Sequence, residues 1–159
     1  MNDSMTPLVL SPEPVTTVAT VEVPTGIACV ELHHTAVAID QLPALFDAGY
    51  GVLAGLGPIG PGYAIYDGDP GSTFDLTIGF PVATSPGSLP AEVRVGEFPS
   101  GRMLLHSHVG DFEGLPGAWD ELTARPDARD RDRVIEIYVT DPSVTPVEEL
   151  RTDLLVPLT

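Results

Sequence analysis

Short runs of alternating hydrophobic and polar residues recur along the chain, separated by segments rich in glycine and proline. Alternation predicts strands, whereas hydrophobic residues three and four positions apart predict a helix. Strands are predicted over about residues 27–33, 63–66, 74–80, 102–108, 134–139 and 150–156. A helix is predicted after the first strand, with Leu42, Leu45, Phe46 and Leu53 on one face, and another after the fourth, with Leu115, Ala118, Trp119 and Leu122. Asp40 is predicted to cap the first helix.

The predicted elements come in two sets because the sequence contains an internal repeat. Five residues align with identical ones in the second set: Val18, Glu22, Pro24, Gly26 and His33 with Val93, Glu97, Pro99, Gly101 and His108. Farther along, Ile65-Tyr66 aligns with Ile137-Tyr138. We therefore predict repeat one over residues 18–82, a connector over 83–92 and repeat two over 93–158, all within one domain, 18–159, after a flexible tail over 1–17.

Each repeat has the order strand–helix–strand–strand, and this order predicts the fold class. Helices packed on one face of an antiparallel sheet give an α+β fold. Two such units related by a pseudo-twofold axis leave a central cleft at their junction, which is a natural place for a ligand.

The net charge of the chain limits the classes of partner that it is expected to bind. It has 7 basic residues, all arginine, and 23 acidic residues, for a formal net charge of −16. Such a charge repels phosphate backbones and anionic lipid surfaces, so neither direct nucleic-acid binding nor a membrane partner is expected.

The apolar runs are too short to span a membrane, and the single cysteine, Cys29, agrees with a reducing compartment, so a cytoplasmic location is predicted. A monomer and a homodimer are both compatible with the sequence.

Glu136 is the first candidate for a functional residue. It interrupts the apolar run Val134–Val139, and alternation places Glu136 and Tyr138 on one face of that strand. A carboxylate within a largely apolar strand is costly unless it meets a donor, a cation or water. It could be the counter-ion for a cationic ligand or a general base, whereas a sheet face in contact with water would give it no function.

Aromatic residues and a histidine complete the candidate site. Tyr66 and Tyr138 occupy equivalent places in the two repeats, so they are predicted to face each other and to stack on a flat ligand, or simply to pack together. Trp119 and Phe46 lie on the apolar faces of their helices. Each could line the ligand site, or it could belong to the hydrophobic core instead. His106 and His108 share a strand face, but no third ligand has a suitable spacing, so no metal and no cofactor is predicted. His106 is retained as a possible partner of Glu136.

Three segments carry a resemblance to a known family: His108–Leu122, Ile135–Pro142 and Leu150–Leu158, with Gly60–Pro70 as the counterpart in repeat one. Together they resemble the GyrI-like small-molecule-binding family, which is similar to the effector-binding domain of AraC- and MerR-type multidrug regulators. The resemblance implies a pseudo-twofold pair of units around a cavity and ligands that are lipophilic, often aromatic and cationic. It also implies that Glu136 lies in the cavity among aromatic side chains.

The resemblance leaves three functions open. The first is a stand-alone binding protein that sequesters or senses lipophilic, cationic aromatic molecules through Glu136, Tyr66, Tyr138 and Trp119. The second is a hydrolase that opens cyclopropane-type rings of DNA-alkylating natural products, with Glu136 activating water and Tyr138 or His106 donating a hydrogen bond to the developing oxyanion. The third is an acidic interaction protein similar to gyrase inhibitors.

Overall fold

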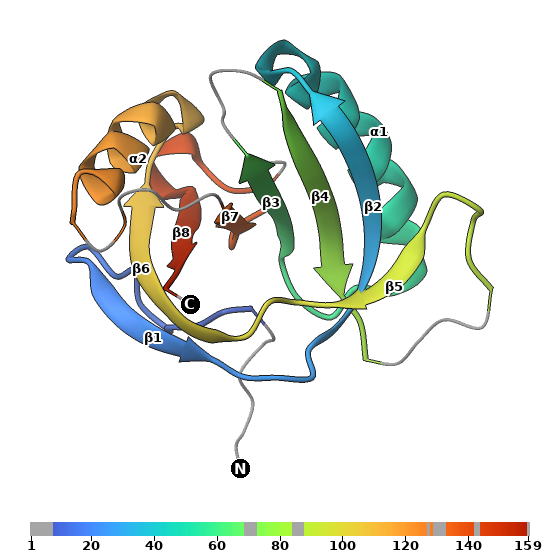
Figure 1. Cartoon of the computed structure of the whole chain (residues 1–159), viewed down its shortest axis with the longest axis horizontal. Coiled ribbons are helices and arrows are strands. Elements are labelled where there is room, and N and C mark those ends of the chain that lie inside the picture. Colours follow the sequence, from blue (N-terminus) through green and yellow to red (C-terminus); the bar gives the residue numbers. More distant parts are fainter. Residues whose placement is uncertain are drawn as a thin grey trace.

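The computed structural model describes residues 8–68, 73–83, 88–126, 128, 133–141 and 144–158. Within them, eight strands form one antiparallel sheet that carries two α-helices, which confirms the α+β prediction (Figure 1). The strands are β1 (Ala19–Val23), β2 (Ala28–Val37), β3 (Gly62–Gly68), β4 (Phe74–Pro81), β5 (Arg94–Glu97), β6 (Gly101–Val109), β7 (Arg133–Tyr138) and β8 (Arg151–Pro157). The α-helices are α1 (Leu42–Leu53) and α2 (Leu115–Thr123).

The order of the strands reflects the internal repeat. Across the sheet it is β1-β6-β8-β7-β3-β4-β2-β5, which is symmetric about the central pair, β7 and β3. In that pair Ala64 lies directly opposite Glu136, its equivalent in the other repeat. The pseudo-twofold axis therefore passes beside these two residues, at the middle of one continuous sheet.

The six predicted strands are present, and two short strands were not predicted. β1 and β5 contain five and four residues, too few for alternation to be recognised. Each pairs with a strand of the other repeat, β1 with β6 and β5 with β2. The two repeats thus exchange their first strands.

The first helix, α1, begins later than predicted. A 3-10 turn, Ile39–Gln41, precedes α1 and contains Asp40, so Gln41 rather than Asp40 is the residue before the helix. Pro43 lies in the first turn, where its missing N–H breaks no helical hydrogen bond. α1 packs closely on β4. The two elements approach so closely at Gly49 that a Cβ atom there would overlap the side chain of Ile78.

The two faces of the sheet are both covered. On one face, α1 packs over β2 and β4 and α2 packs over β6, with β3 and β7 between the two helices (Figure 1). We call this the helix face. The opposite face carries a core that includes Tyr63, Phe98 and Ile137, and Leu8, Leu10 and Val15 pack against it.

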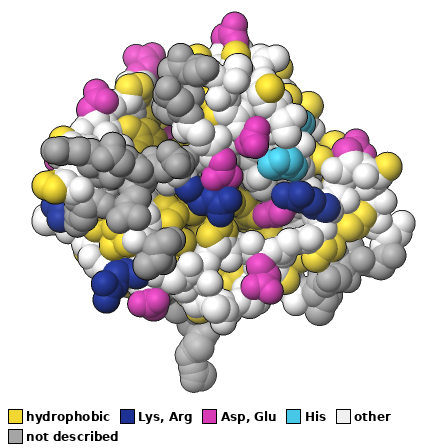
Figure 2. Space-filling model, viewed as in Figure 1, with side chains coloured by type: hydrophobic (Ala, Val, Ile, Leu, Met, Phe, Trp, Pro, Cys, Tyr) yellow, Lys and Arg dark blue, Asp and Glu magenta, His cyan; other side chains and the backbone are white. Residues whose placement is uncertain are grey.

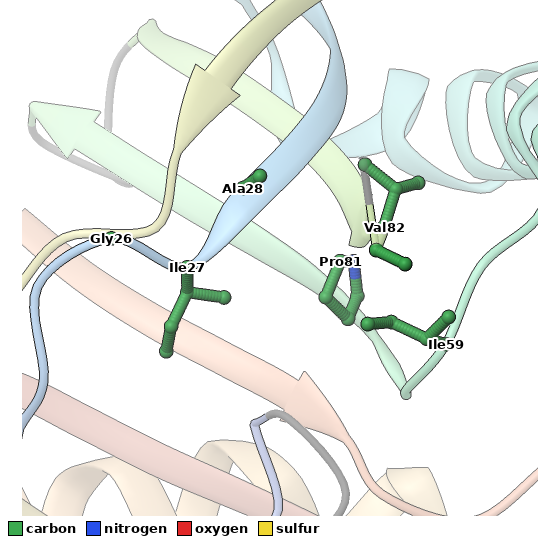
Figure 3. A pocket seen from close by; sticks show the side chains of 7 residues that line it. Gly26, Ile27, Ala28, Ile59, Pro81 and Val82 are labelled. Atoms are coloured by element: carbon green, nitrogen blue, oxygen red, sulfur yellow. The ribbon is translucent and has the colours of Figure 1, made fainter. Parts of the chain in front are cut away.

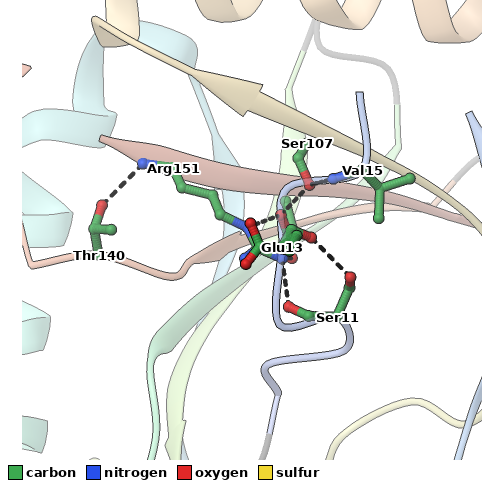
Figure 4. Close-up of polar contacts among 7 residues, drawn as sticks. Ser11, Glu13, Val15, Ser107, Thr140 and Arg151 are labelled. Carbon is green, nitrogen blue, oxygen red and sulfur yellow. Dashed lines mark hydrogen bonds and ion pairs between the residues drawn. The ribbon is translucent and has the colours of Figure 1, made fainter. Parts of the chain in front are cut away.

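Residues 8–17 belong to the segment for which a flexible tail was predicted, and the structure gives them specific contacts (Figure 4). Val15 N–H donates to Ser107 Oγ at 2.8 Å, and Ser107 N–H donates to the Val15 carbonyl oxygen. Arg151 Nη2 donates to the Ser11 carbonyl oxygen at 3.0 Å, while its guanidinium pairs with Asp153 at 2.9 Å. These partners are buried, so this part of the chain closes the face opposite the helices.

Some predicted features lie outside the described residues. They include residues 1–7 of the predicted tail, 84–87 of the connector, and Asp69, Pro70 and Pro142 of the repeated segments. Among the residues that are described, no helix is long and apolar enough to cross a membrane.

Candidate functional site

Glu136 lies at the middle of β7 on the helix face of the sheet. Its neighbours along the strand, Ile135 and Ile137, point to the opposite core and are fully buried. Glu136 is itself only 7% exposed. Burial of a carboxylate is unfavourable unless its oxygens are hydrogen-bonded, so its partners decide what the site can do.

Three side chains donate hydrogen bonds to the Glu136 carboxylate. Tyr66 Oη donates to Oε1 at 3.0 Å and Tyr138 Oη donates to the same oxygen at 2.6 Å. Trp119 Nε1 reaches from α2 and donates to Oε2 at 2.7 Å. A carboxylate offers about four lone-pair positions, so one on Oε2 is left for a further donor.

Tyr66 and Tyr138 come together because they are equivalent residues beside the pseudo-twofold axis. Their hydroxyl oxygens are 3.4 Å apart. Burial, and then the adjacent Glu136 carboxylate, raise the pKa of Tyr66 well above its ordinary value. Burial, followed by Tyr66 and Glu136, does the same to the pKa of Tyr138. Both phenols therefore remain protonated and act as donors to the carboxylate.

An aromatic cluster surrounds Tyr138. Phe46 and Tyr50 approach it from α1, with ring centroids 6.1 and 6.2 Å from that of Tyr138. Phe112, in the 3-10 turn Phe112–Gly114 before α2, approaches within 6.3 Å and is 40% exposed. Neither Tyr50 nor Phe112 was among the sequence candidates. Tyr50 follows Phe46 by one helical turn and could have been found by spacing, whereas nothing in the sequence singles out Phe112.

His106 is on the helix face but does not contact Glu136. In the sheet Leu154 lies between them, opposite His106 on one side and opposite Glu136 on the other. His106 is 7% exposed, and its Nδ1 has no hydrogen-bond partner among the residues described. The described part of the chain contains no group of three or more His, Cys, Asp and Glu side chains that could hold a metal ion.

The negative charge of Glu136 is balanced differently from that of the other buried carboxylates. Ion pairs join Arg94 to Glu31 and Arg151 to Asp153, and neither of these arginines reaches Glu136. The three donors that contact Glu136 are neutral groups. The site therefore has hydrogen-bonding partners for a carboxylate but takes no positive charge from these donors.

A hollow in the described structure lies away from this site. It has a volume of about 250 Å³ and is lined by Gly26, Ile27, Ala28, Ile59, Pro81, Val82 and Ala83 (Figure 3). These side chains are apolar and carry no titratable or nucleophilic group. The hollow therefore has no side chain that could bind a charged group or take part in catalysis, and the candidate site remains the one around Glu136.

The acidic residues do not form one patch on the face of the molecule that Figure 2 shows. Acidic and arginine side chains are interspersed there, over a band of hydrophobic side chains.

Comparison with known proteins agrees with the geometry of the fold. Residues 38–159 match the GyrI-like small molecule binding domain. The chain belongs to the GyrI-like family. Because this match covers most of the chain, the protein is a GyrI-like small-molecule-binding protein. Among curated protein sequences, none matches it.

Solved structures with the same fold have little sequence in common with this GyrI-like chain. SAV2435, solved with bound tetraphenylphosphonium, has a TM-score of 0.69 and 12% identity over 91% of this chain and 94% of that one. The EcmrR C-terminal domain has a TM-score of 0.65 and 16% identity over 89% and 96%. A hydrolase from Listeria innocua has a TM-score of 0.58 and 16% identity over 92% and 93%.

Proposed function

We propose that this GyrI-like protein binds lipophilic cations that contain aromatic rings, with Glu136 as the counter-ion. The observation that carries the proposal is a buried carboxylate held only by neutral donors, Tyr66, Tyr138 and Trp119, in the contacts described above. A cation that reaches the carboxylate would gain an attraction that these donors do not supply.

Aromatic side chains support the same proposal. Phe46, Tyr50 and Phe112 surround Tyr138, and ring faces attract cations as well as flat apolar groups. The structurally similar SAV2435 was solved with tetraphenylphosphonium, which is a lipophilic aromatic cation. A ligand would enter between α1 and α2, above β3 and β7. Binding of this kind would suit sequestration or sensing of such compounds.

The test compares two probes of nearly equal size and opposite charge, tetraphenylphosphonium and tetraphenylborate. At a separation of about 6 Å and an effective dielectric constant of about 20, one carboxylate attracts one cation by about 3 kcal/mol. We expect Glu136→Gln to weaken phosphonium binding by up to roughly a hundredfold and not to weaken borate binding. Titration calorimetry measures both.

Glu31→Gln is the matched control. Glu31 is a second buried carboxylate that accepts a hydrogen bond from a tyrosine, Tyr63, but it lies on the opposite face of the sheet. Its substitution should leave phosphonium binding unchanged. Equal phosphonium affinity in the parent protein and Glu136→Gln, or a preference for the borate, would overturn the proposal.

A second candidate is hydrolysis of a strained, electrophilic ring. The observation in its favour is the remaining acceptor position on Glu136 Oε2, next to phenols that stay protonated. There the carboxylate would take a proton from water as the water oxygen bonds to a ring carbon. The ring C–C bond would break, its electrons would move to a conjugated carbonyl oxygen, and Tyr138 would protonate that oxygen. The proton that Glu136 took from water would then pass to Tyr138 through the hydrogen bond between them, which restores both groups.

Turnover separates this candidate from simple binding. A spirocyclopropyl dienone is a suitable probe, and its ring-opened product can be followed by chromatography. We expect product formation to fall at least a hundredfold in Glu136→Gln if the carboxylate is the base. Equal product with the parent protein, with Glu136→Gln and without protein would rule out hydrolysis and leave the binding proposal standing.

A further inference from the structure

The pseudo-twofold axis allows each residue on the helix face to be compared with its equivalent in the other repeat. One row of residues crosses the middle of the sheet. In repeat one it contains Leu32, Ile78 and Ala64, and in repeat two it contains Glu136, Leu154 and His106. The axis between Ala64 and Glu136 relates Ile78 to Leu154 and Leu32 to His106. The sequence alignment of His33 with His108 is therefore wrong by one residue, because His34, opposite Leu76, is the residue equivalent to His108, opposite Thr152.

A second pair follows from the two tyrosines. Leu76 lies directly opposite Tyr66, and Thr152 lies directly opposite Tyr138. At three related positions, therefore, repeat one has Ala64, Leu76 and Leu32 where repeat two has Glu136, Thr152 and His106. Because the apolar side chains of repeat one fill equivalent places beneath α1, the fold itself does not require polar residues at these positions.

Thr152 and His106 each have one polar side-chain atom without a hydrogen bond in the described structure. Thr152 is fully buried and His106 is 7% exposed. Thr152 Oγ1 and His106 Nδ1 are buried without a hydrogen-bond partner among the residues described. Such groups are rare in native proteins because an unmade buried hydrogen bond is costly. Among the described residues there are three such atoms: these two on one side of Glu136, and Nε2 of His34 in repeat one, opposite Leu76.

Both atoms lie within reach of a ligand bound at Glu136. Thr152 is the diagonal neighbour of Glu136 on the adjacent strand, at a Cα separation of roughly 7–8 Å. His106 is two strands away, at roughly 10 Å. A ligand whose cation contacts the Glu136 carboxylate can therefore place a hydrogen-bonding group against Thr152 or His106.

We propose that Thr152 and His106 form a polar arm of the ligand site. This inference rests on the proposed function, because it assumes that a cation binds at Glu136. The ligand is then an asymmetric amphiphile: a protonated amine carrying a hydroxyl or carbonyl group, which binds to the arm, and an aromatic part, which lies toward the apolar half formed by repeat one. A symmetric onium ion without hydrogen-bonding groups would use only part of the site.

Two phenothiazine drugs provide matched probes. Trifluoperazine and fluphenazine differ only in a methyl or a hydroxyethyl group on the terminal amine. We expect the hydroxyl to raise affinity about fivefold to tenfold in the parent protein, as one hydrogen bond of about 1 kcal/mol would do. This advantage should disappear in Thr152→Val and decrease in His106→Leu, whereas trifluoperazine binding should change little.

The equivalent position in repeat one supplies the control. Leu76→Val changes the buried residue on the apolar side that is equivalent to Thr152, and it should preserve the preference for fluphenazine. If both drugs bind with equal affinity, or if the preference survives in Thr152→Val, the polar arm is overturned while the binding proposal stands. If neither drug binds to the parent protein, the proposed function and the polar arm fail together.

Thermal unfolding gives a second readout that needs no ligand. Thr152→Val removes a hydroxyl that has no partner in the described structure and keeps the shape of the side chain. The midpoint of unfolding should therefore stay the same or rise. A lower midpoint would mean that the hydroxyl already serves the fold, and this would contradict its assignment to a ligand.

Discussion

Arg151→Leu is expected to lower the free energy of unfolding by about 3–5 kcal/mol, because it leaves a buried carboxylate without its cation. Asp153 has no exposed surface, and the Arg151 guanidinium binds both of its carboxylate oxygens, at 2.9 and 3.0 Å. The same guanidinium holds the Ser11 carbonyl oxygen. The variant should therefore also release the segment around residues 8–17. Denaturant unfolding measures the first effect, and susceptibility of this segment to proteolysis measures the second.

A surface ion pair provides the control for this experiment. Arg133 pairs with Asp67 at 2.6 Å, but its side chain is 46% exposed. Arg133→Leu should cost at most about 1 kcal/mol. Replacing both Arg151 and Asp153 by leucine should recover much of the lost stability, since no buried charge then remains. If Arg151→Leu proves no more harmful than Arg133→Leu, the buried pair does not support the fold as described.

The second large effect is expected in an alkaline titration of the tyrosines. The chain has four, Tyr50, Tyr63, Tyr66 and Tyr138, and burial raises the pKa of each well above the ordinary value of 10.0. In the native protein, ultraviolet absorbance should therefore show almost no tyrosinate as the pH passes 10. In the urea-unfolded protein, all four should titrate close to that value.

The raised pKa values of the four tyrosines determine how the free energy of unfolding changes with pH. Because the folded protein holds these protons more tightly than the unfolded chain, their contribution to stability is fully present below pH 10 and is lost as the pH rises above it. Tyrosinate should consequently appear together with unfolding, in one cooperative step. Ionisation of one tyrosine at an ordinary pKa while circular dichroism remains native would show that at least one of these side chains is accessible to water.

Much of the fold could be predicted because the repeat supports each weak local signal with a second one. The strand at Tyr63–Tyr66 is short, but its alignment with the clearer strand around Ile137 makes it convincing. β1 and β5 were missed because they are too short for a pattern. Residues 8–17 were expected to be loose because they contain prolines and no period. Their contacts with Ser107 and Arg151 join positions 92 and 140 residues apart in the sequence, and a local pattern cannot indicate such contacts.

Alternation and the internal repeat made part of the candidate site predictable. The contacts that depend on helix placement and strand register could not be predicted. Alternation placed Glu136 beside Tyr138, and the duplication placed Tyr66 opposite them. The hydrogen bond from Trp119 depends on where α2 lies relative to β7, and periodicity contains no information about that placement. Thr152 was missed for a similar reason: it lies between charged residues in the sequence, and only the register of β7 with β8 brings it opposite Tyr138.

The exchange of β1 and β5 between the repeats determines how the protein can admit a ligand. Each half is hydrogen-bonded to the other at the centre of the sheet and again at both of its outer edges. The halves therefore cannot rotate apart as rigid bodies about a hinge without breaking strand pairs in three places. Space for a ligand at the proposed site must therefore come from shifts of α1 and α2 and from side-chain rotation, while the sheet beneath keeps its shape.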